Sequence, residues 1–368
     1  MVTAAVVEER GGPFRLTRVE FDDLRPDEVR VRVRAAGVCH TDLAARDGRT
    51  PFPLPAVLGH EGAGVVEEIG SAVTSVAPGD RVVLSFPSCG HCTACRTGRP
   101  VQCDHWVHLN LLGGSRLDGS SPVRRPDGRP LHAHFFGQSS FATHATAPER
   151  GVVRVESSAP WQALAPLGCG TQTGAGTVLN VLRPEPGTSL VVYGAGGVGL
   201  AAVLAARLTP VTQVIVVDRI AERLALATSL GATATVNAVG QDVSEAVAEL
   251  TSGRGADYVL ESTGVPAVLR QAVDLVAVNG RVAVVGAPPF GSEVSLDVPS
   301  MLTRNPTVIG VNQGFSVPQR MIPALAALQD AGRFPLERLV TAFAFEEIND
   351  AATAAENGGA VKPVLLMD

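Results

Sequence analysis

The stretch VVYGAGGVGL, residues 191–200, decides the fold of this chain. An apolar run that predicts a buried strand turns through glycines into a predicted helix from Leu200 to Arg207. Gly194, Gly196 and Gly199 form the pattern G-x-G-x-x-G. In a dinucleotide site the first glycine makes the turn, the second admits a pyrophosphate, and the third lets the helix pack on the strand. Because glycine-rich turns are also common in loops, the pattern alone leaves both interpretations open.

The residues after this stretch favour the dinucleotide interpretation. A second apolar run, residues 214–217, ends in Asp218, nineteen residues after the last glycine of the pattern. In dinucleotide-binding folds, a carboxylate ~20 residues after the glycine pattern binds the hydroxyls of the adenosine ribose. It also repels a 2′-phosphate, which favours NAD over NADP. The backbone N–H groups at Gly197 and Val198 are expected to face the phosphates. Arg219 either stacks on the adenine or is a solvated charge, so use of both cofactors stays open.

Length and composition limit the class of protein. With 368 residues, 45% of them hydrophobic, the chain is long enough for two domains with sizeable cores. A net charge of −6 without a basic cluster argues against a nucleic-acid partner. The N-terminal residues do not resemble a signal peptide, and no apolar run is long enough to span a membrane. We therefore expect an intracellular, cytoplasmic protein.

Two kinds of secondary-structure pattern divide the chain. Strand and helix patterns alternate from Leu190 to about Gly310, which predicts a parallel, doubly wound sheet. Residues 28–38 alternate valine with arginine, which predicts an antiparallel strand with one solvent-facing side. A last strand at residues 361–366 is expected to return to the antiparallel part. PTVIGV, residues 306–311, is expected at an edge of the parallel sheet.

Four of the six cysteines crowd into residues 89–103 with the spacing C-x2-C-x2-C-x7-C. Such short spacings let thiolates surround one tetrahedral ion, with Zn–S near ~2.3 Å, and four thiolates leave no open position. We therefore predict a structural zinc site rather than disulfides. Iron–sulfur clusters use related spacings, yet no second cluster motif accompanies this one. The four ligands are Cys89, Cys92, Cys95 and Cys103; the nearby His91, His105 and His108 are interpreted as surface or loop residues.

Other chemically active side chains gather where strands end. GVCHTD, residues 37–42, places a thiol, an imidazole, a hydroxyl and a carboxylate together, and GHEG, residues 59–62, presents an imidazole and a carboxylate on a tight turn. A lone cysteine such as Cys39 is more often a small buried hydrophobe than a ligand. Residues 104–140 predict a hairpin or a lid. Three phenylalanines at its end suggest either an apolar pocket or ordinary core: Phe135, Phe136 and Phe141.

Taken together, these motifs resemble the zinc-dependent medium-chain alcohol dehydrogenases over essentially the full chain. The resemblance is carried by GVCHTD, GHEGAGVVEEIG, the four-cysteine lobe, PLGCG and GAGGVG, which follow the family's order. GVCHTDLAARDG and VVLSFPSCGHC are most similar to the aryl (benzyl) alcohol branch. The resemblance implies an α/β fold with a Rossmann-type doubly wound sheet at residues 171–311. A mainly β GroES-like catalytic domain with the structural-zinc lobe is expected at residues 1–170 and 312–368.

The resemblance also implies a catalytic zinc site. Cys39, His60 and Cys169 are expected to bind the ion, and three such ligands leave zinc one open position. Glu61 falls at the second-ligand or ligand-exchange position. Asp42 is expected to orient the histidine ligand.

Further roles follow for proton transfer and cofactor binding. Thr41 is expected to take the substrate proton. Many relatives have a histidine three residues later, but Ala44 stands there, so the proton has to leave by the ribose hydroxyls and water, or by another route. Four more residues are expected at the cofactor: His40 and Lys362 at the pyrophosphate, and Val285 and Ala287 at the nicotinamide carboxamide.

The leading hypothesis is an NAD-dependent enzyme with two zinc ions that interconverts a primary aromatic or allylic alcohol and its aldehyde. An enzyme of thiol–formaldehyde adducts on the same scaffold is the nearest rival, and it would need cations such as Arg124 and Arg125 in the pocket. A zinc-stabilised nucleotide-binding protein without catalysis is the remaining alternative. Family likeness implies a homodimer or homotetramer.

Overall fold

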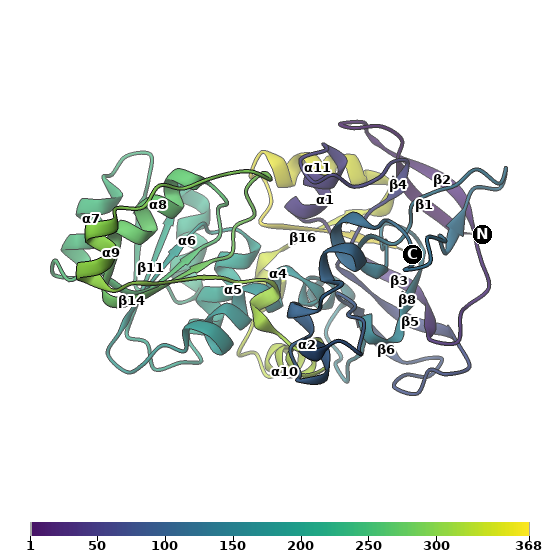
Figure 1. Ribbon diagram of the computed structural model, residues 1–368, viewed down its shortest axis with the longest axis horizontal. Coiled ribbons are helices and arrows are strands. Elements are labelled where there is room, and N and C mark those ends of the chain that lie inside the picture. The colour runs from purple at the N-terminus through teal and green to yellow at the C-terminus, as the bar shows by residue number, and fades with distance from the viewer. Residues whose placement is uncertain (1, 368) are drawn as a thin grey trace. The chain divides into compact units, whose positions relative to one another are not determined.

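The protein divides into two compact units in a computed structural model that describes residues 2–367 (Figure 1). The first unit comprises Met1–Cys169 and Ser316–Asp368, and the second comprises Gly170–Phe315. The sequence analysis placed the two domain boundaries after residues 170 and 311, whereas the two units of the structure divide after residues 169 and 315. None of the helices in the described residues is both long and apolar enough to cross a membrane.

The second unit contains a six-stranded parallel sheet in the order β12-β11-β10-β13-β14-β15. This order confirms the predicted Rossmann-type fold, and it reverses between β10 and β13, where such folds bind their ligands. β15 lies at the edge. The strands of this parallel sheet are β10 (Ser189–Tyr193), β11 (Gln213–Asp218), β12 (Ala234–Asn237), β13 (Ala256–Glu261), β14 (Val276–Val284) and β15 (Thr307–Gly310).

Helices connect these strands, as Figure 1 shows in teal and green. Small residues let α4 pack closely against α5: a Cβ added at Gly174 would lie 2.0 Å from the carbonyl oxygen of Val198. This explains the run of small residues in TQTGAGTV. The helices are α4 (Gly170–Gly176), α5 (Gly197–Ala206), α6 (Ala221–Leu230), α7 (Val243–Leu250), α8 (Pro266–Leu275) and α9 (Val298–Arg304).

The first unit is mainly β, as predicted, and has two sheets. The larger has the order β16-β17-β3-β5-β6-β9, with β8 also on β3, and the smaller has the order β4-β1-β2-β7. The strands of the larger sheet are β3 (Glu28–Gly37), β5 (Gly62–Ile69), β6 (Arg81–Leu84), β8 (His144–Pro148), β9 (Val152–Arg154), β16 (Val340–Ala344) and β17 (Lys362–Leu366). Those of the smaller are β1 (Val2–Val7), β2 (Phe14–Phe21), β4 (Ala56–Val57) and β7 (Val123–Arg124). The unit's α-helices are α1 (His40–Arg46), α2 (Thr93–Arg96), α3 (Trp161–Leu164), α10 (Pro318–Asp330) and α11 (Ile348–Glu356).

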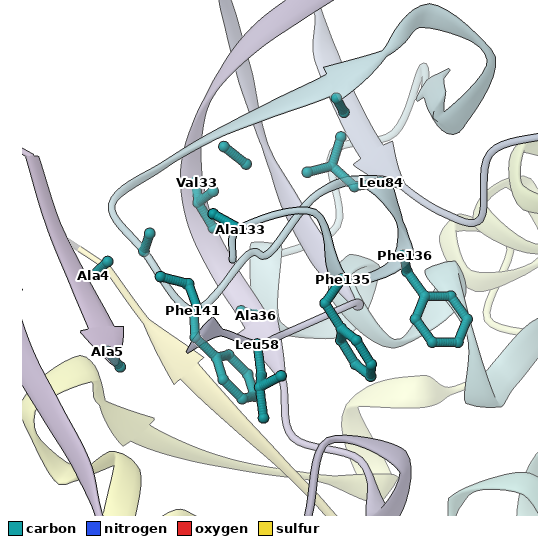
Figure 2. Packing of buried hydrophobic residues seen from close by; sticks show 14 of the residues in the cluster. Ala4, Ala5, Val33, Ala36, Leu58, Leu84, Ala133, Phe135, Phe136 and Phe141 are labelled. Atoms are coloured by element: carbon teal, nitrogen blue, oxygen red, sulfur yellow. The ribbon is translucent and has the colours of Figure 1, made fainter. Parts of the chain in front are cut away.

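The core of this unit brings together distant segments, as Figure 2 shows for Val33, Leu58 and Phe141. Phe141 is fully buried and packs edge-on against Phe14, with ring centroids 5.6 Å apart. Phe135 and Phe136 are buried in the same cluster, so the core interpretation holds for all three phenylalanines. The face of β3 that was expected to be exposed to solvent is partly covered. Cζ of Arg30 lies over the ring of Phe21, 3.9 Å from its centroid.

Residues 104–140 form neither a simple hairpin nor a free lid. The segment contains a π-helical turn η2 (His108–Leu112), the strand β7, which pairs with β2, and a 3-10 turn η3 (Phe135–Gly137). Arg116 anchors it from within by two hydrogen bonds to the buried Glu28, of 2.6 and 2.8 Å. The high content of glycine and serine concealed this buried ion pair from sequence reasoning.

Candidate active site

Asp42, on α1 and fully buried, organises two predicted zinc ligands. Its Oδ2 accepts the backbone N–H of Cys39 at 2.9 Å, which closes the first turn of the helix. Its Oδ1 accepts the backbone N–H of Gly59 at 3.0 Å and contacts Nδ1 of His60 at 2.8 Å. Because a carboxylate can only accept, Nδ1 of His60 carries the proton and Nε2 is the nitrogen left to bind a metal.

Close backbone approaches fix the loops that carry the ligands. Gly59 has φ of +91°, and a Cβ there would lie 2.4 Å from the backbone nitrogen of Phe141. A Cβ at Gly168, the residue before Cys169, would lie 2.2 Å from the carbonyl oxygen of Leu84. Glycine is therefore required beside two of the three ligands.

Gln138 is a site residue that sequence reasoning missed. Its side chain is buried and brackets the histidine turn: Nε2 donates to the carbonyl oxygen of His60 at 3.0 Å, and Oε1 accepts the N–H of Gly62 at 3.1 Å. Only its position within a loop beside aromatic residues could have drawn attention to it.

Ligand atoms of Cys39, His60, Glu61 and Cys169 lie within 4.8 Å of one another, so the structure brings together residues from three separate segments of the first unit. Nε2 of His60 is buried and has no hydrogen-bond partner. An orphaned imidazole nitrogen beside two thiols is a donor set that suits zinc. The residues present therefore fit a zinc ion.

The site's electrostatics also favour a cation. Burial lowers the pKa of His60, but the charge and hydrogen bond of Asp42 outweigh it and raise the pKa to about 10. The hydrogen bond from Cys169, opposed by burial and aided by the charge of Lys362, lowers the pKa of the Cys39 thiol. Zinc uptake therefore competes with protons for these ligand atoms.

Glu61 is fully buried, and its carboxylate accepts two hydrogen bonds of 3.0 Å from Nζ of Lys362. Burial raises the pKa of Glu61, while the charge of Lys362 opposes this rise. A Cβ at Gly37 would lie 2.0 Å from Glu61 Oε2. Sequence reasoning placed Lys362 at the pyrophosphate and did not predict this pairing.

Aromatic rings surround the histidine ligand. Phe136 stacks on His60 with centroids 4.4 Å apart, and Phe135 meets the same imidazole edge-on at 5.5 Å. Trp106 packs edge-on against Phe136 at 5.9 Å, and Phe52 against Phe135 at 4.9 Å. The surroundings of His60 are therefore apolar and aromatic, and they are formed by buried rings of the core.

Three predicted residues lie along α1. The hydroxyl of Thr41 lies 3.7 Å from Sγ of Cys39. His40 is exposed, and Ala44 is partly exposed on the next turn. Of these three side chains, Thr41 is the one that contacts a predicted ligand.

The four-cysteine group fits a tetrahedral ion. Ligand atoms of Cys89, Cys92, Cys95 and Cys103 lie within 4.8 Å of one another, and the sulfurs of Cys89 and Cys95 are 4.0 Å apart. Two sulfurs each ~2.3 Å from a tetrahedral ion are roughly 3.8 Å apart. Hydrogen bonds from the backbone of Asp104 and Cys95 lower the pKa of Cys92 to about 6, which favours the thiolate.

The glycine pattern takes the geometry of a dinucleotide site. Gly194 has φ of +93°, and a Cβ at Gly199 would lie 1.8 Å from the carbonyl oxygen of Gly194. Nothing lies within 4 Å of a Cβ at Gly196, so space remains for a phosphate at the N-terminus of α5. Asp218 ends β11, and its carboxylate accepts the backbone N–H groups of Ala195 at 2.6 Å, Arg219 at 2.7 Å and Ile220 at 2.9 Å.

Glu261, at the end of β13, was also missed by sequence reasoning. Its buried carboxylate accepts the N–H groups of Thr263 at 2.5 Å and Gly264 at 3.1 Å. The backbone carbonyl oxygen of Glu261 accepts the N–H groups of Val285 and Gly286, both at 2.9 Å. A Cβ at Gly264 would lie 3.0 Å from the carbonyl carbon of Ala287. Glu261 thus joins two loops, one of which carries the predicted carboxamide-binding residues.

Comparison with known proteins agrees with this geometry. Residues 25–157 match the alcohol dehydrogenase GroES-like domain, and residues 197–330 match the zinc-binding dehydrogenase family. Geraniol dehydrogenase of Castellaniella defragrans is 44% identical over 363 residues, which cover 99% of this chain and 97% of the relative.

Two solved structures are similar over the whole chain. An alcohol dehydrogenase zinc-binding domain protein from Burkholderia ambifaria has a TM-score of 0.97 and 48% identity, covering 100% of this chain and 99% of that one. Benzyl alcohol dehydrogenase from Acinetobacter calcoaceticus has a TM-score of 0.96 and 43% identity, with the same coverage. The chain therefore belongs to the zinc-dependent medium-chain alcohol dehydrogenases and is an NAD-dependent alcohol oxidoreductase of that family.

Proposed function

We propose that the protein transfers hydride between NAD and a primary alcohol whose carbinol carbon is attached to an aromatic ring or a carbon–carbon double bond. Oxidation gives the aldehyde, NADH and a proton. The buried aromatic packing around His60, with Phe136 stacked at 4.4 Å, is the observation that carries this proposal, because it makes the surroundings of the ligand apolar. The names of two relatives, geraniol and benzyl alcohol dehydrogenase, support it.

The residues of the first unit divide the work at the alcohol. Cys39, His60 and Cys169 would hold the zinc ion, which would supply a Lewis acid that lowers the pKa of an alcohol hydroxyl. Thr41, whose hydroxyl lies 3.7 Å from Sγ of Cys39, takes the alcohol's proton and passes its own hydroxyl proton on toward the cofactor ribose. Ala44 offers no imidazole to pass the proton onward, so the proton leaves through ribose hydroxyls and water.

The remaining predicted residues hold the cofactor under this proposal. The N-terminus of α5 at Gly196 binds the pyrophosphate, and Asp218 binds the adenosine ribose while its carboxylate also orders the glycine turn. Each of the other residues contributes one contact: Arg219 at the adenine, His40 at the phosphates, and Val285 and Ala287 at the carboxamide. Lys362, also predicted at the phosphates, instead donates from its buried Nζ to Glu61 and to the carbonyl oxygen of Val38.

The rival substrate class, thiol–formaldehyde adducts, loses its predicted cations. Arg125 is paired with Glu8 at 2.6 Å, and Arg124 with Asp22 at 3.0 Å. Both guanidinium groups are therefore paired with carboxylates of the protein itself, which leaves neither of them free to bind a substrate carboxylate. The reduced thiols that the two metal sites need also fit the proposed cytoplasmic location.

The test compares matched alcohols at saturating NAD⁺. Geraniol is paired with its saturated analogue citronellol, and benzyl alcohol with cyclohexylmethanol; a glutathione–formaldehyde adduct and NADP⁺ complete the panel. We expect kcat/KM to favour the unsaturated member of each pair by roughly tenfold or more. Equal rates within both pairs, or preference for the thiol adduct, would overturn the proposal.

We also propose a homodimer through the edge strand β15. This strand leaves one row of backbone groups without a neighbouring strand in the described residues. Exposed apolar side chains accompany it in the second unit: Val278, Val298, Leu302 and Val308. Light scattering should give twice the mass of one chain, and Val308→Glu should halve it; a monomeric unsubstituted protein contradicts the proposal.

A further inference from the structure

Three side chains beside the four-cysteine group form a second, overlapping set of metal ligands. Cys89, His91 and His105 each offer a ligand atom, and these atoms lie within 4.8 Å of one another. The two imidazole rings are 6.0 Å apart between centroids. We propose that these three residues form an accessory site for one further zinc-type ion, distinct from the structural and catalytic ions.

His91 is oriented as a ligating histidine would be. Its Nδ1 lies 2.9 Å from the carbonyl oxygen of Cys89. A carbonyl oxygen has no hydrogen to give, so Nδ1 carries the proton and Nε2 keeps its lone pair for a cation. Ligating histidines commonly donate their other ring N–H to a backbone carbonyl in this way. The orientation of His91 therefore supports the site independently of the clustering.

Cys89 links the accessory site to the structural one. Four thiolates around one Zn²⁺ leave the group with net negative charge, so a shared sulfur retains electron density for a second ion. Thiolate and imidazole are both ligands that zinc accepts. A cysteine shared between two ions therefore places the accessory ion at the rim of the lobe.

Exposure sets the accessory site apart from the other two. His91 and His105 are both exposed, whereas Cys103 of the structural group and His60 of the catalytic group are buried. Water completes the coordination of an ion held by exposed imidazoles, so we expect weaker and more readily reversible binding than at either other site.

The experiment uses the full chain with both other zinc sites loaded. Protein is dialysed against buffered micromolar free Zn²⁺, and its metal content is measured by mass spectrometry. We expect three ions per chain, one for each ligand group. The double variant His91→Ala/His105→Ala should hold two. His108→Ala, which removes a neighbouring exposed imidazole outside the group, is the matched control and should hold three.

Cobalt identifies the ligands. Co²⁺ added to the zinc-loaded protein should produce a sulfur-to-cobalt charge-transfer band in the unsubstituted protein and in His108→Ala, but not in the double variant. The double variant could lose the structural ion as well and then would not test the accessory site. In that case the single variants His91→Ala and His105→Ala are measured, and each must weaken the charge-transfer band by itself. Two zinc ions in the unsubstituted protein, a third ion kept by the double variant, or a third ion without the band overturns the proposal. None of these results bears on alcohol oxidation, which is measured separately.

Discussion

Lys362 and Glu61 form a buried ion pair beside the zinc ligands, with Nζ 3.0 Å from both carboxylate oxygens. The two residues are 301 positions apart in sequence. Each neutralises a charge that would otherwise be costly inside the protein. The pair therefore fixes the protonation and position of the carboxylate next to His60.

Removing one partner of this pair should be strongly destabilising. Lys362→Met removes the ammonium group that donates to both oxygens of the buried Glu61 carboxylate, and we expect a loss of about 3–5 kcal/mol in the free energy of unfolding. Urea unfolding of the zinc-loaded protein measures it. The double variant Lys362→Met/Glu61→Gln should recover much of this loss, and a double-mutant cycle without coupling would show that the pair contributes nothing.

Asp42→Asn should weaken zinc binding at the catalytic site. The substitution removes the charge that orients His60 and orders the N–H of Cys39, and losses of this kind typically cost ~10–100-fold in metal affinity. Competition with a chelator, followed by metal analysis, measures the change. Asp350→Asn, at an exposed position on α11, is the control. Equal retention of zinc in both variants contradicts the role assigned to Asp42.

Ala44→His should change the dependence of rate on pH. Since Ala44 provides no proton relay, kcat of the unsubstituted enzyme is expected to keep rising above neutral pH. An imidazole on this turn of α1 can accept the proton from Thr41 and pass it to water, so the rise should flatten. Steady-state kinetics across pH measures this, and an unchanged profile in the variant counts against the relay.

Glu261→Ala should loosen cofactor binding. Without the carboxylate, the loop carrying Thr263 and Gly264 loses its acceptor, and we expect KM for NAD⁺ to rise roughly tenfold, equivalent to about 1.4 kcal/mol. Glu261→Gln keeps Oε1 as an acceptor and should stay near the unsubstituted value. Initial rates with NAD⁺ varied separate KM from kcat. If the alanine variant changes only thermal stability, Glu261 serves the fold alone.

His134 should make stability fall in mild acid. Burial lowers the pKa of His134 to about 4, whereas the unfolded chain binds this proton near pH ~6.5. Between these values the unfolded state holds more protons, so the free energy of unfolding declines as pH falls, by about 3 kcal/mol in full. Unfolding titrations of the unsubstituted protein and His134→Gln measure the difference. Parallel curves for the two proteins would contradict it.

The sequence predicted those parts of the site whose geometry depends on residues close together in the chain. The glycine pattern and the four cysteines were readable because their geometry is local. The convergence of Cys39, His60 and Cys169 could be predicted only from family resemblance, since spacing does not show that three distant segments meet. Gln138 and Glu261 were missed because their roles are hydrogen bonds to backbone groups that only the folded chain brings near.

Lys362 has one more consequence, which concerns the order of synthesis. Its strand, β17, pairs with β3, yet a ribosome delivers it only after the whole second unit, Gly170–Phe315, has been made. Until then, the nascent first unit holds Glu61 without its counter-ion. The second unit is one continuous stretch and can fold as it emerges, so the finishing step of translation is the one that completes the ion pair beside the zinc ligands.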